Sequence, residues 1–269
     1  MLIAPDNAPI SPDFGDLEYD PPGHEELLAS MQRLRGSQYL QDGAISADEL
    51  SPDGRHRLSI DDKSWHLLSV DSGGLVCGCV RYRKYANTAE FDDLGVRNSA
   101  LARWPHEGLR LRRAVETELG VARLRQVSYV EVGGWAVAPE YRFSTEALRT
   151  ALATYALARN LGGCLGITTA TVRHASSSIL RKIGGSSLQW DGKELPAYYD
   201  PQYRCEMEIL RFDSKSPAGK YAQMVDQLSS EIRGIPVICR TRPTIFQFPA
   251  YARGTAREYP DRVALPCTA

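Results

Sequence analysis

Residues 128–147 read Ser-Tyr-Val-Glu-Val-Gly-Gly-Trp-Ala-Val-Ala-Pro-Glu-Tyr-Arg-Phe-Ser-Thr-Glu-Ala, and this stretch decides the fold. Its first part is mostly apolar and contains two adjacent glycines, which is typical of a buried strand that approaches another group closely. Pro139 is expected to end the strand. The pattern therefore predicts a central strand followed directly by a turn.

The turn at residues 142–145 leads into a second pattern, in which apolar residues from Ala147 to Leu157 recur at helical spacing. The turn is thus expected at a helix N-terminus, where backbone N–H groups lack partners and the helix dipole is positive. Arg142 lies in the same turn. This combination suits an anion, above all a phosphate group.

The composition is that of a globular protein, with 269 residues and 43% hydrophobic side chains, enough for one large domain or two small ones. The 32 basic and 33 acidic residues nearly cancel, which argues against a general nucleic-acid binder. Between Tyr141 and Lys182, however, only Glu146 is acidic. The basic residues there are Arg142, Arg149, Arg159, Arg173, Arg181 and Lys182.

The cysteines and histidines give no sign of a metal site. The six cysteines have no Cys-x-x-Cys spacing, and the five histidines form no i,i+4 pair. With no secretory leader expected, we interpret the cysteines as reduced, structural thiols and the protein as cytoplasmic. No apolar run approaches the roughly 20 residues of a transmembrane helix.

The chain is expected to divide into a flexible N-terminal arm (1–22), a folded domain (23–234) and a proline-rich C-terminal tail (235–269). Within the domain, the patterns predict a helix from His24 to near Gly36, a hairpin over 65–83, and a long connection over 84–126 that contains a basic helix ending near Gly120. The strand over 164–170 is expected to lie parallel to the central strand. A helix over 175–183, strands over 187–190 and 203–212, and a helix over 221–232 complete the order.

This order of elements resembles the GNAT acyltransferase fold, and residues 137–148 resemble the phosphate-binding loop of that superfamily, with Thr145 where the family usually has glycine. The resemblance implies an α/β (α+β) protein with a mixed central sheet flanked by helices. It also implies that acyl-CoA or acyl-phosphopantetheine is the cosubstrate, with no tightly bound cofactor. The residues expected to bind it are Trp135, Ala136 and Val137 on the strand and Arg142, Phe143, Ser144, Thr145, Glu146 and Ala147 on the turn.

Two further stretches resemble the acyl-homoserine-lactone synthases and the long-chain N-acyl amino acid synthases. One is residues 61–82, with paired aspartates, a hairpin and a Gly-x-x-Arg ending; the other is the long connection, which lies beside the acyl pocket in those enzymes. By this resemblance Asp62 and Arg81 bind the acceptor, or they form only a hairpin salt bridge. Trp104 lines the acyl pocket, or it is ordinary core.

The central strand is similar to the synthase pattern Glu-x-x-Arg-Phe-x-Val, with Glu131 conserving the glutamate and Gly134 replacing the arginine. Because this arginine is replaced, we do not expect lactone formation, and amide formation is the activity that the resemblance still implies. Glu131 is the candidate base for the amine; alternatively, it lies at the solvated end of the strand or pairs with an arginine such as Arg81. The tyrosine that often protonates the thiolate in this fold corresponds to Leu180 here, so water would have to serve.

The resemblance therefore implies an N-acyltransferase that moves a long-chain acyl group from acyl carrier protein or coenzyme A to a small amine such as an amino acid. Two alternatives stay open: a short-chain N-acetyltransferase, and a non-catalytic protein of this fold that binds an acyl thioester or a partner protein. Acyl carrier protein is the expected macromolecular partner, and its acidic surface would dock on the arginines that follow Arg142.

Overall fold

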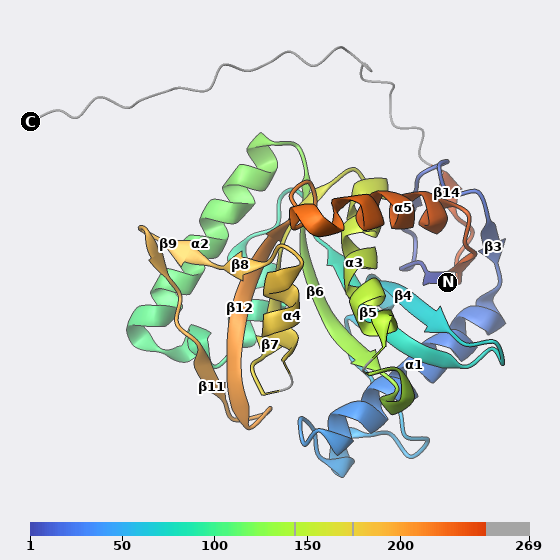
Figure 1. Cartoon of the computed structure of the whole chain (residues 1–269), viewed down its shortest axis with the longest axis horizontal. Helices are drawn as coiled ribbons and strands as arrows, with labels where there is room; N and C mark the ends of the chain where they lie inside the picture. Colours follow the sequence, from blue (N-terminus) through green and yellow to red (C-terminus); the bar gives the residue numbers. More distant parts are fainter. Residues whose placement is uncertain (143, 174, 246–269) are drawn as a thin grey trace, which may run out of the picture.

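The computed structural model describes residues 1–142, 144–173 and 175–245, and a ten-stranded mixed sheet runs through its centre (Figure 1). The order in space is β11 (Tyr198–Asp200), β12 (Cys205–Asp213), β7 (Cys164–Thr171), β6 (Ser128–Val137), β5 (Val76–Lys84), β4 (Trp65–Val70), β1 (Leu2–Ile3), β13 (Val237–Cys239) and β3 (Leu17–Tyr19), with β8 (Ser186–Ser187) also paired to β12. Two small ribbons join β9 (Gln189–Trp190) to β10 (Lys193–Glu194) and β2 (Pro9–Ile10) to β14 (Thr244–Ile245). The predicted fold class, a mixed central sheet flanked by helices, is confirmed.

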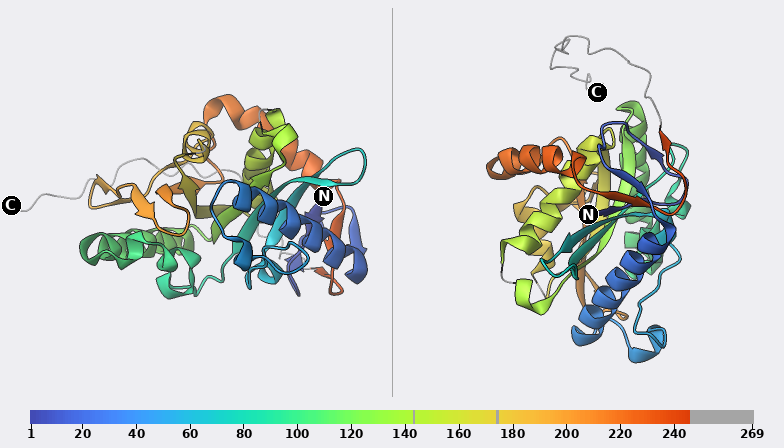
Figure 2. Two further views of the ribbon diagram at one scale, coloured as in Figure 1. Left: turned by 90° about the horizontal axis from the view of Figure 1, so that it is seen from below. Right: turned by 90° about the vertical axis from the view of Figure 1, so that its right-hand side faces the viewer.

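The α-helices of the described residues cover the sheet: α1 (Pro21–Gln41), α2 (Pro105–Leu124), α3 (Thr145–Asn160), α4 (Ser176–Lys182) and α5 (Ala222–Arg233). Figure 2 shows α3 and α5 on one side of the sheet and α1 and α2 on the other. Short 3-10 turns lie at Ala47–Glu49, Asp61–Lys63, Phe91–Asp93, Gly95–Asn98, Leu101–Arg103, Pro139–Tyr141 and Gly219–Tyr221. No α-helix within the described ranges is both long enough and apolar enough to cross a bilayer.

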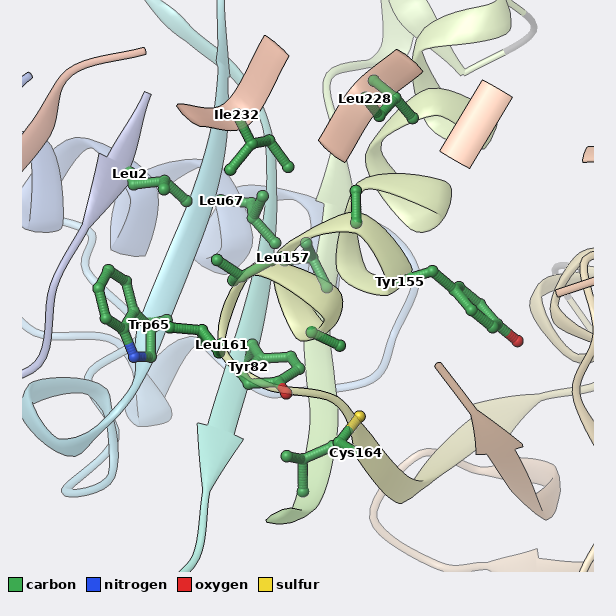
Figure 3. Close-up of a cluster of buried hydrophobic side chains, with 14 of the residues drawn as sticks. Leu2, Trp65, Leu67, Tyr82, Tyr155, Leu157, Leu161, Cys164, Leu228 and Ile232 are labelled. Atoms are coloured by element: carbon green, nitrogen blue, oxygen red, sulfur yellow. The ribbon is translucent and has the colours of Figure 1, made fainter. Parts of the chain in front are cut away.

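Side-chain alternation along the strands explains why both faces are covered. Trp65, Leu67 and Tyr82 point toward α3 and α5, where they pack with Leu157 and Leu228 in one core cluster (Figure 3). Their neighbours on the strands point the other way: Leu68 and Cys79 pack with Leu28 and Met31 of α1. The sheet is thus buried on both sides, which fixes its register.

Most predicted elements are present at the expected positions. The hairpin of β4 and β5 is antiparallel, and β6 and β7 are parallel neighbours. Helix α2 differs, because it continues through Gly120 to Leu124. The helix predicted to end near Gly36 also continues, to Gln41. One glycine lowers the stability of a helix by only about 1 kcal/mol, which tertiary packing outweighs in both cases.

The chain ends differ from the expectation of a flexible arm at 1–22 and an irregular tail after residue 235. Leu2 and Ile3 form a strand between β4 and β13, and both side chains are almost fully buried. Val237–Cys239 pairs with β1 on one side and β3 on the other. Strands of two or three residues are too short to show a period, so the sequence pattern missed them. Residues 246–269, with Cys267, lie outside the described residues; the other five cysteines are buried free thiols.

We expect Leu2→Ala to lower the free energy of unfolding by about 2–5 kcal/mol, because Leu2 is 0% exposed and packs in the main core cluster. Urea denaturation measures this change. Leu124→Ala is the matched control: Leu124 is 86% exposed at the end of α2, so its loss should change stability by no more than about 0.5 kcal/mol. A Leu2→Ala protein as stable as the wild type would contradict the placement of β1 in the sheet.

Candidate active site

Strand β6 carries an extra residue at the two glycines. Arg81 of β5 lies opposite Gly133, whereas Cys79 lies opposite Ala136, so two steps along β5 match three steps along β6. This is a β-bulge, and Gly134 adopts the left-handed backbone conformation within it, with φ of 63°. A side chain at Gly134 would be strained and would also come within 3.3 Å of the Arg81 Cβ. The bulge therefore depends on glycine at this position.

Strands β6 and β7 separate just before the bulge, which begins at Gly133. Their pairing runs from Ser128 opposite Cys164 to Val132 opposite Thr168, although β6 continues to Val137. Beyond Val132, β6 stays paired with β5, and β7 stays paired with β12 as far as Thr171. The two strands thus part like the arms of a V, and a gap opens in the middle of the sheet (Figure 1).

The backbone of Val137 faces this gap. The Ala138 N–H donates to the carbonyl of Cys77 on β5 at 2.8 Å. In an antiparallel pair, successive residues point their N–H and C=O groups alternately toward and away from the partner strand. Val137 therefore directs both groups away from β5, toward the side where β7 has departed. No hydrogen bond from these two Val137 groups is found among the described residues.

Helix α3 begins at Thr145, as predicted, and follows β6 after the 3-10 turn Pro139–Tyr141. Ser144 is its N-cap, and the Ser144 hydroxyl accepts a hydrogen bond from the Glu146 N–H at 3.1 Å. Ala147 follows in the first turn. Phe143 lies outside the described residues. The turn thus places a helix N-terminus at the mouth of the gap.

Arg142 has partners that the sequence did not reveal. Its guanidinium donates to the carboxylate of Asp42 at 3.1 Å and to the Gln38 side-chain oxygen at 2.8 Å, both at the C-terminal end of α1. Arg173, which follows β7, donates to the Asp42 carbonyl at 2.7 Å. The end of α1 therefore connects the segments on both sides of the gap.

A buried group of charged side chains lies on the α1 face of the sheet, beside the bulge. Arg35 of α1 forms a two-pronged ion pair with Asp61, at 2.9 and 2.7 Å. Asp61 also accepts from the Gln32 side chain at 3.0 Å and the Leu58 N–H at 3.1 Å. Burial opposes the charge on Asp61, but the Arg35 bonds outweigh it and lower the pKa of Asp61. Asp61 is thus ionised and its carboxylate has four hydrogen-bond donors, whereas the Arg35 Nε has no described partner.

His66 of β4 joins this group through its Nε2, which lies 3.0 Å from the Asp61 carbonyl oxygen. Burial lowers the pKa of His66 to about 4, so the ring is neutral in the folded protein. The unfolded chain would bind a proton at a pKa near 6.5. His66 therefore makes the fold less stable as the pH falls from about 6.5 toward 4.

Arg81 is different, because its charge has no ion-pair partner among the described carboxylates. Its Nε and Nη1 are buried without hydrogen-bond partners in the described chain. Side chains added at Gly133 and Gly134 would come within 3.2 and 3.6 Å of its guanidinium, which therefore lies over the two glycines. Burial lowers the pKa of Arg81, and the charge of Arg35 adds to the effect. Such an unsatisfied cation is costly, and a carboxylate from a ligand would relieve the cost.

Aromatic rings adjoin the two arginines. Tyr39 of α1 lies edge-on to Tyr203, with 6.4 Å between ring centroids, and 5.7 Å from the ring of His56. Burial raises the pKa of both tyrosines, while the positive charges of Arg35 and Arg81 act in the opposite direction. Segments distant in sequence therefore build one wall beside Arg81.

Glu131 is already occupied in this structure. Its carboxylate accepts hydrogen bonds from the Tyr85 hydroxyl and from the backbone N–H groups of Gly95 and Val96, both at 2.8 Å. These donors belong to the long connection after β5, so Glu131 fastens that connection to β6. Three of the roughly four acceptor positions of the Glu131 carboxylate are therefore taken, and one position on Oε1 has no described donor.

The remaining predicted residues have mixed outcomes. Asp62 does not pair with Arg81; its side chain is 50% exposed and accepts from Arg240 at 3.0 Å. The adjacent Asp61 is the buried aspartate. Trp104 is 42% exposed at the start of α2, so it does not line an enclosed pocket. Trp135 is partly buried against the main core, and its indole N–H has no described partner.

Arg35 and Asp61 are the site residues that sequence reasoning missed. Arg35 follows Met31 by four positions and Leu28 by seven, so it lies on the buried stripe of α1, and this spacing could have identified it. The choice between Asp61 and Asp62 had no such signal, since it depends on a 3-10 turn.

A separate cavity of about 210 Å³ lies between β4, α3 and α5, lined among others by Met1, Leu67, Thr150 and Ile232. It is on the opposite face of the sheet from Arg81, and no buried polar side-chain atom in its described lining lacks a partner. No group of three or more potential metal ligands is found in the described part of the chain.

Comparison with known proteins identifies the fold. No protein-family model and no curated protein matches the sequence. Among solved structures, the CoA-dependent acyl-homoserine lactone synthase BjaI, with SAM and isopentyl-CoA, is 18% identical, with 82% of this chain and 89% of that chain covered and a TM-score of 0.50. The synthase LasI is 19% identical (73% and 85% covered, TM-score 0.44), and FeeM, an N-acyl amino acid synthase from uncultured soil microbes, is 10% identical (72% and 87%, 0.45). The BjaI match confirms the fold that the sequence resemblance implied.

We expect Asp61→Asn to lower the free energy of unfolding by about 3–5 kcal/mol, because it leaves the fully buried Arg35 without a countercharge. Chemical denaturation at pH 7 measures the loss. Asp62→Asn is the matched control at the next position: its ion pair with Arg240 is exposed, and we expect a change of about 0–1 kcal/mol. Equal effects of the two substitutions would contradict the assignment of Asp61 as the buried partner.

Proposed function

We propose that this protein is an N-acyltransferase that moves an acyl group from a thioester to the amine of a small acceptor that also carries a carboxylate. One observation carries the proposal: β6 and β7 part beside the buried, unpartnered guanidinium of Arg81. A gap with exposed strand edges suits an extended pantetheine arm, and an unpaired cation next to it suits an anionic acceptor. BjaI, which shares the general fold, is a CoA-dependent acyl-homoserine lactone synthase, and this agrees with the proposal.

The donor would lie along β6 within the gap. The Val137 N–H and C=O would bind the amide groups of the pantetheine arm, in the way that an added strand binds a sheet edge. The phosphate at the end of the arm would reach the first turn of α3, between Thr145 and Ala147, where helix N–H groups and Arg142 favour an anion. This assigns to the turn and to residues 135–137 the roles that the sequence suggested.

The acceptor would bind on the α1 face, with its carboxylate on Arg81. Tyr39 and Tyr203 would form the wall on which its side chain rests. Among the predicted acceptor-binding residues, Arg81 is retained in this proposal. Asp62 is replaced by Asp61, which acts indirectly by holding Arg35 next to the site.

Acyl transfer requires a neutral amine, support for the oxyanion and a proton for the departing thiolate. In our proposal the amine enters where the Tyr85 hydroxyl now donates to Glu131, and Glu131 accepts the amine proton. The amine nitrogen forms a bond to the thioester carbon, backbone N–H groups near Trp135–Val137 bind the oxyanion, and the carbon–sulfur bond breaks. Leu180 offers no proton, so water protonates the thiolate.

A second candidate function is the transfer of a short acyl group in place of a long one, and the packing of the long connection favours it. Leu94, Val96 and Leu101 of the connection are buried against Leu111 and Val115 of α2 in one cluster. If the acyl chain lies beside this connection, as the sequence resemblance implies, these packed side chains would take the space of a long chain; Trp104 is 42% exposed. Incubation of the protein with acetyl to palmitoyl thioesters and a mixture of amino acids, followed by mass spectrometry, tests the activity and the chain length together. If none of these donors yields an N-acyl product, the proposed function is wrong.

We expect Arg81→Met to raise KM for the carboxylate acceptor about 10–100-fold, the range expected for losing a charged hydrogen bond of about 1.5–3 kcal/mol. Steady-state kinetics with varied acceptor measures it, and KM for the donor should stay within about twofold. The methyl ester of the same acceptor is the matched control: it lacks the carboxylate, so wild type and variant should use it equally. An unchanged acceptor KM in the variant would contradict the role of Arg81.

A further inference from the structure

We propose that the acyl donor is a coenzyme A thioester in solution and not a thioester carried by an acidic carrier protein. This inference rests on the proposed function and concerns the donor of that same reaction. It follows from the ion pairs formed by the arginines of α3 and α4, which the sequence alone presented as a basic surface.

Three of these arginines are neutralised by carboxylates from distant parts of the chain. Arg149 and Arg159 of α3 pair with Glu231 and Asp226 of α5. Arg181 of α4 pairs with Glu208 of β12 at 3.0 Å, and this hydrogen bond raises the pKa of Arg181 and lowers that of Glu208. These carboxylates therefore reduce the basic excess that was counted along residues 141–182.

The paired carboxylates face the solvent that a docking protein would approach. The side chain of Asp226 is 69% exposed, and that of Glu231 is 36% exposed. Figure 1 shows α5, which carries both, lying across α3. An acidic carrier protein docks through the attraction of its carboxylates to exposed cations, and like charges opposite one another oppose docking. The surface near the donor site is therefore poorly suited to such a partner.

The donor phosphate must also compete with Asp42 for the guanidinium of Arg142. This guanidinium is held by the carboxylate of Asp42, which the donor must displace or outcompete. The arm on a carrier protein brings one phosphodiester with a single negative charge. Coenzyme A brings a pyrophosphate and a further phosphate, and Coulomb attraction grows with charge. The multiply charged donor thus competes better against Asp42.

The test compares one acyl group on the two donors, with the same acceptor and the full-length protein. We expect kcat/KM to be about tenfold or more higher with the coenzyme A thioester, because the carrier protein gains no electrostatic steering. Asp226→Asn combined with Glu231→Gln frees Arg149 and Arg159. This double variant should raise kcat/KM for the carrier-protein donor severalfold and leave the coenzyme A value within about twofold.

Asp42→Asn tests the role of Arg142 independently. The KM of this variant for the coenzyme A thioester should fall about two- to fivefold, because the ion pair between Arg142 and Asp42 that it removes is partly exposed and contributes about 0.2–1 kcal/mol. Asp92→Asn is the matched control, because Asp92 pairs with Arg112 of α2, outside the arginines of the donor site; neither donor's KM should change.

The outcomes separate this inference from the function on which it rests. N-acylation that is as fast or faster with the carrier-protein donor would overturn the inference and leave the N-acyltransferase activity intact. The absence of product from both donors would overturn the activity, and the inference with it. A double variant whose carrier-protein rate is unchanged would show that the α5 carboxylates do not exclude this donor.

Discussion

The extra residue at Gly134 is the constraint on which the arrangement of the site depends. It shifts the register of β6 against β5 just where β6 leaves β7. Up to Val132, β6 is paired on both sides; from Gly133 onward it is paired with β5 only. Only glycine adopts the backbone conformation there without strain. The same glycines leave room for the guanidinium of Arg81, so one feature of the backbone produces both the gap and the space beside it.

The buried charges depend on helix α1. Arg35 places a cation in the core, where the two-pronged bond to Asp61 balances its charge, and the Gln32 and Leu58 contacts donate to the same carboxylate. Burying an ion pair seldom adds stability, but removing one partner is costly, so the pair fixes how α1 sits on the sheet. Seven residues after Arg35, Asp42 contacts Arg142. Helix α1 therefore contacts both the buried charges beside Arg81 and the turn at Arg142 that precedes α3.

The sequence predicted the elements whose patterns are long and regular. Strand β6, helix α3 and the β4–β5 hairpin each have enough residues to show a period and a clear end signal, and each is present. The two- and three-residue strands β1 and β13 are too short to show a hydrophobic period, so the sequence predicts a flexible arm and an irregular tail in their place. Pairing across the sheet places them in it, and that pairing is not visible in local sequence.

The site was less predictable, because its contacts join segments far apart in the chain. Glu131 was identified from its position on an apolar strand, but its partners at Tyr85, Gly95 and Val96 come from a connection with no regular pattern. The carboxylates that pair with Arg149 and Arg159 lie on α5, so local sequence could not reveal that these two arginines are neutralised. Arg35 was the exception, since its helical spacing already indicated burial.

The most direct test of the gap as the donor site is amide hydrogen exchange with and without an acyl thioester. We expect the Val137 amide to exchange faster than the amides of Val130–Val132 in the free protein, because only Val130–Val132 is paired with strands on both sides. Adding the thioester should slow exchange at residues 135–137 and at the first turn of α3. Protection around Leu67 and Ile232 instead, at the cavity between β4 and α5, would contradict the account.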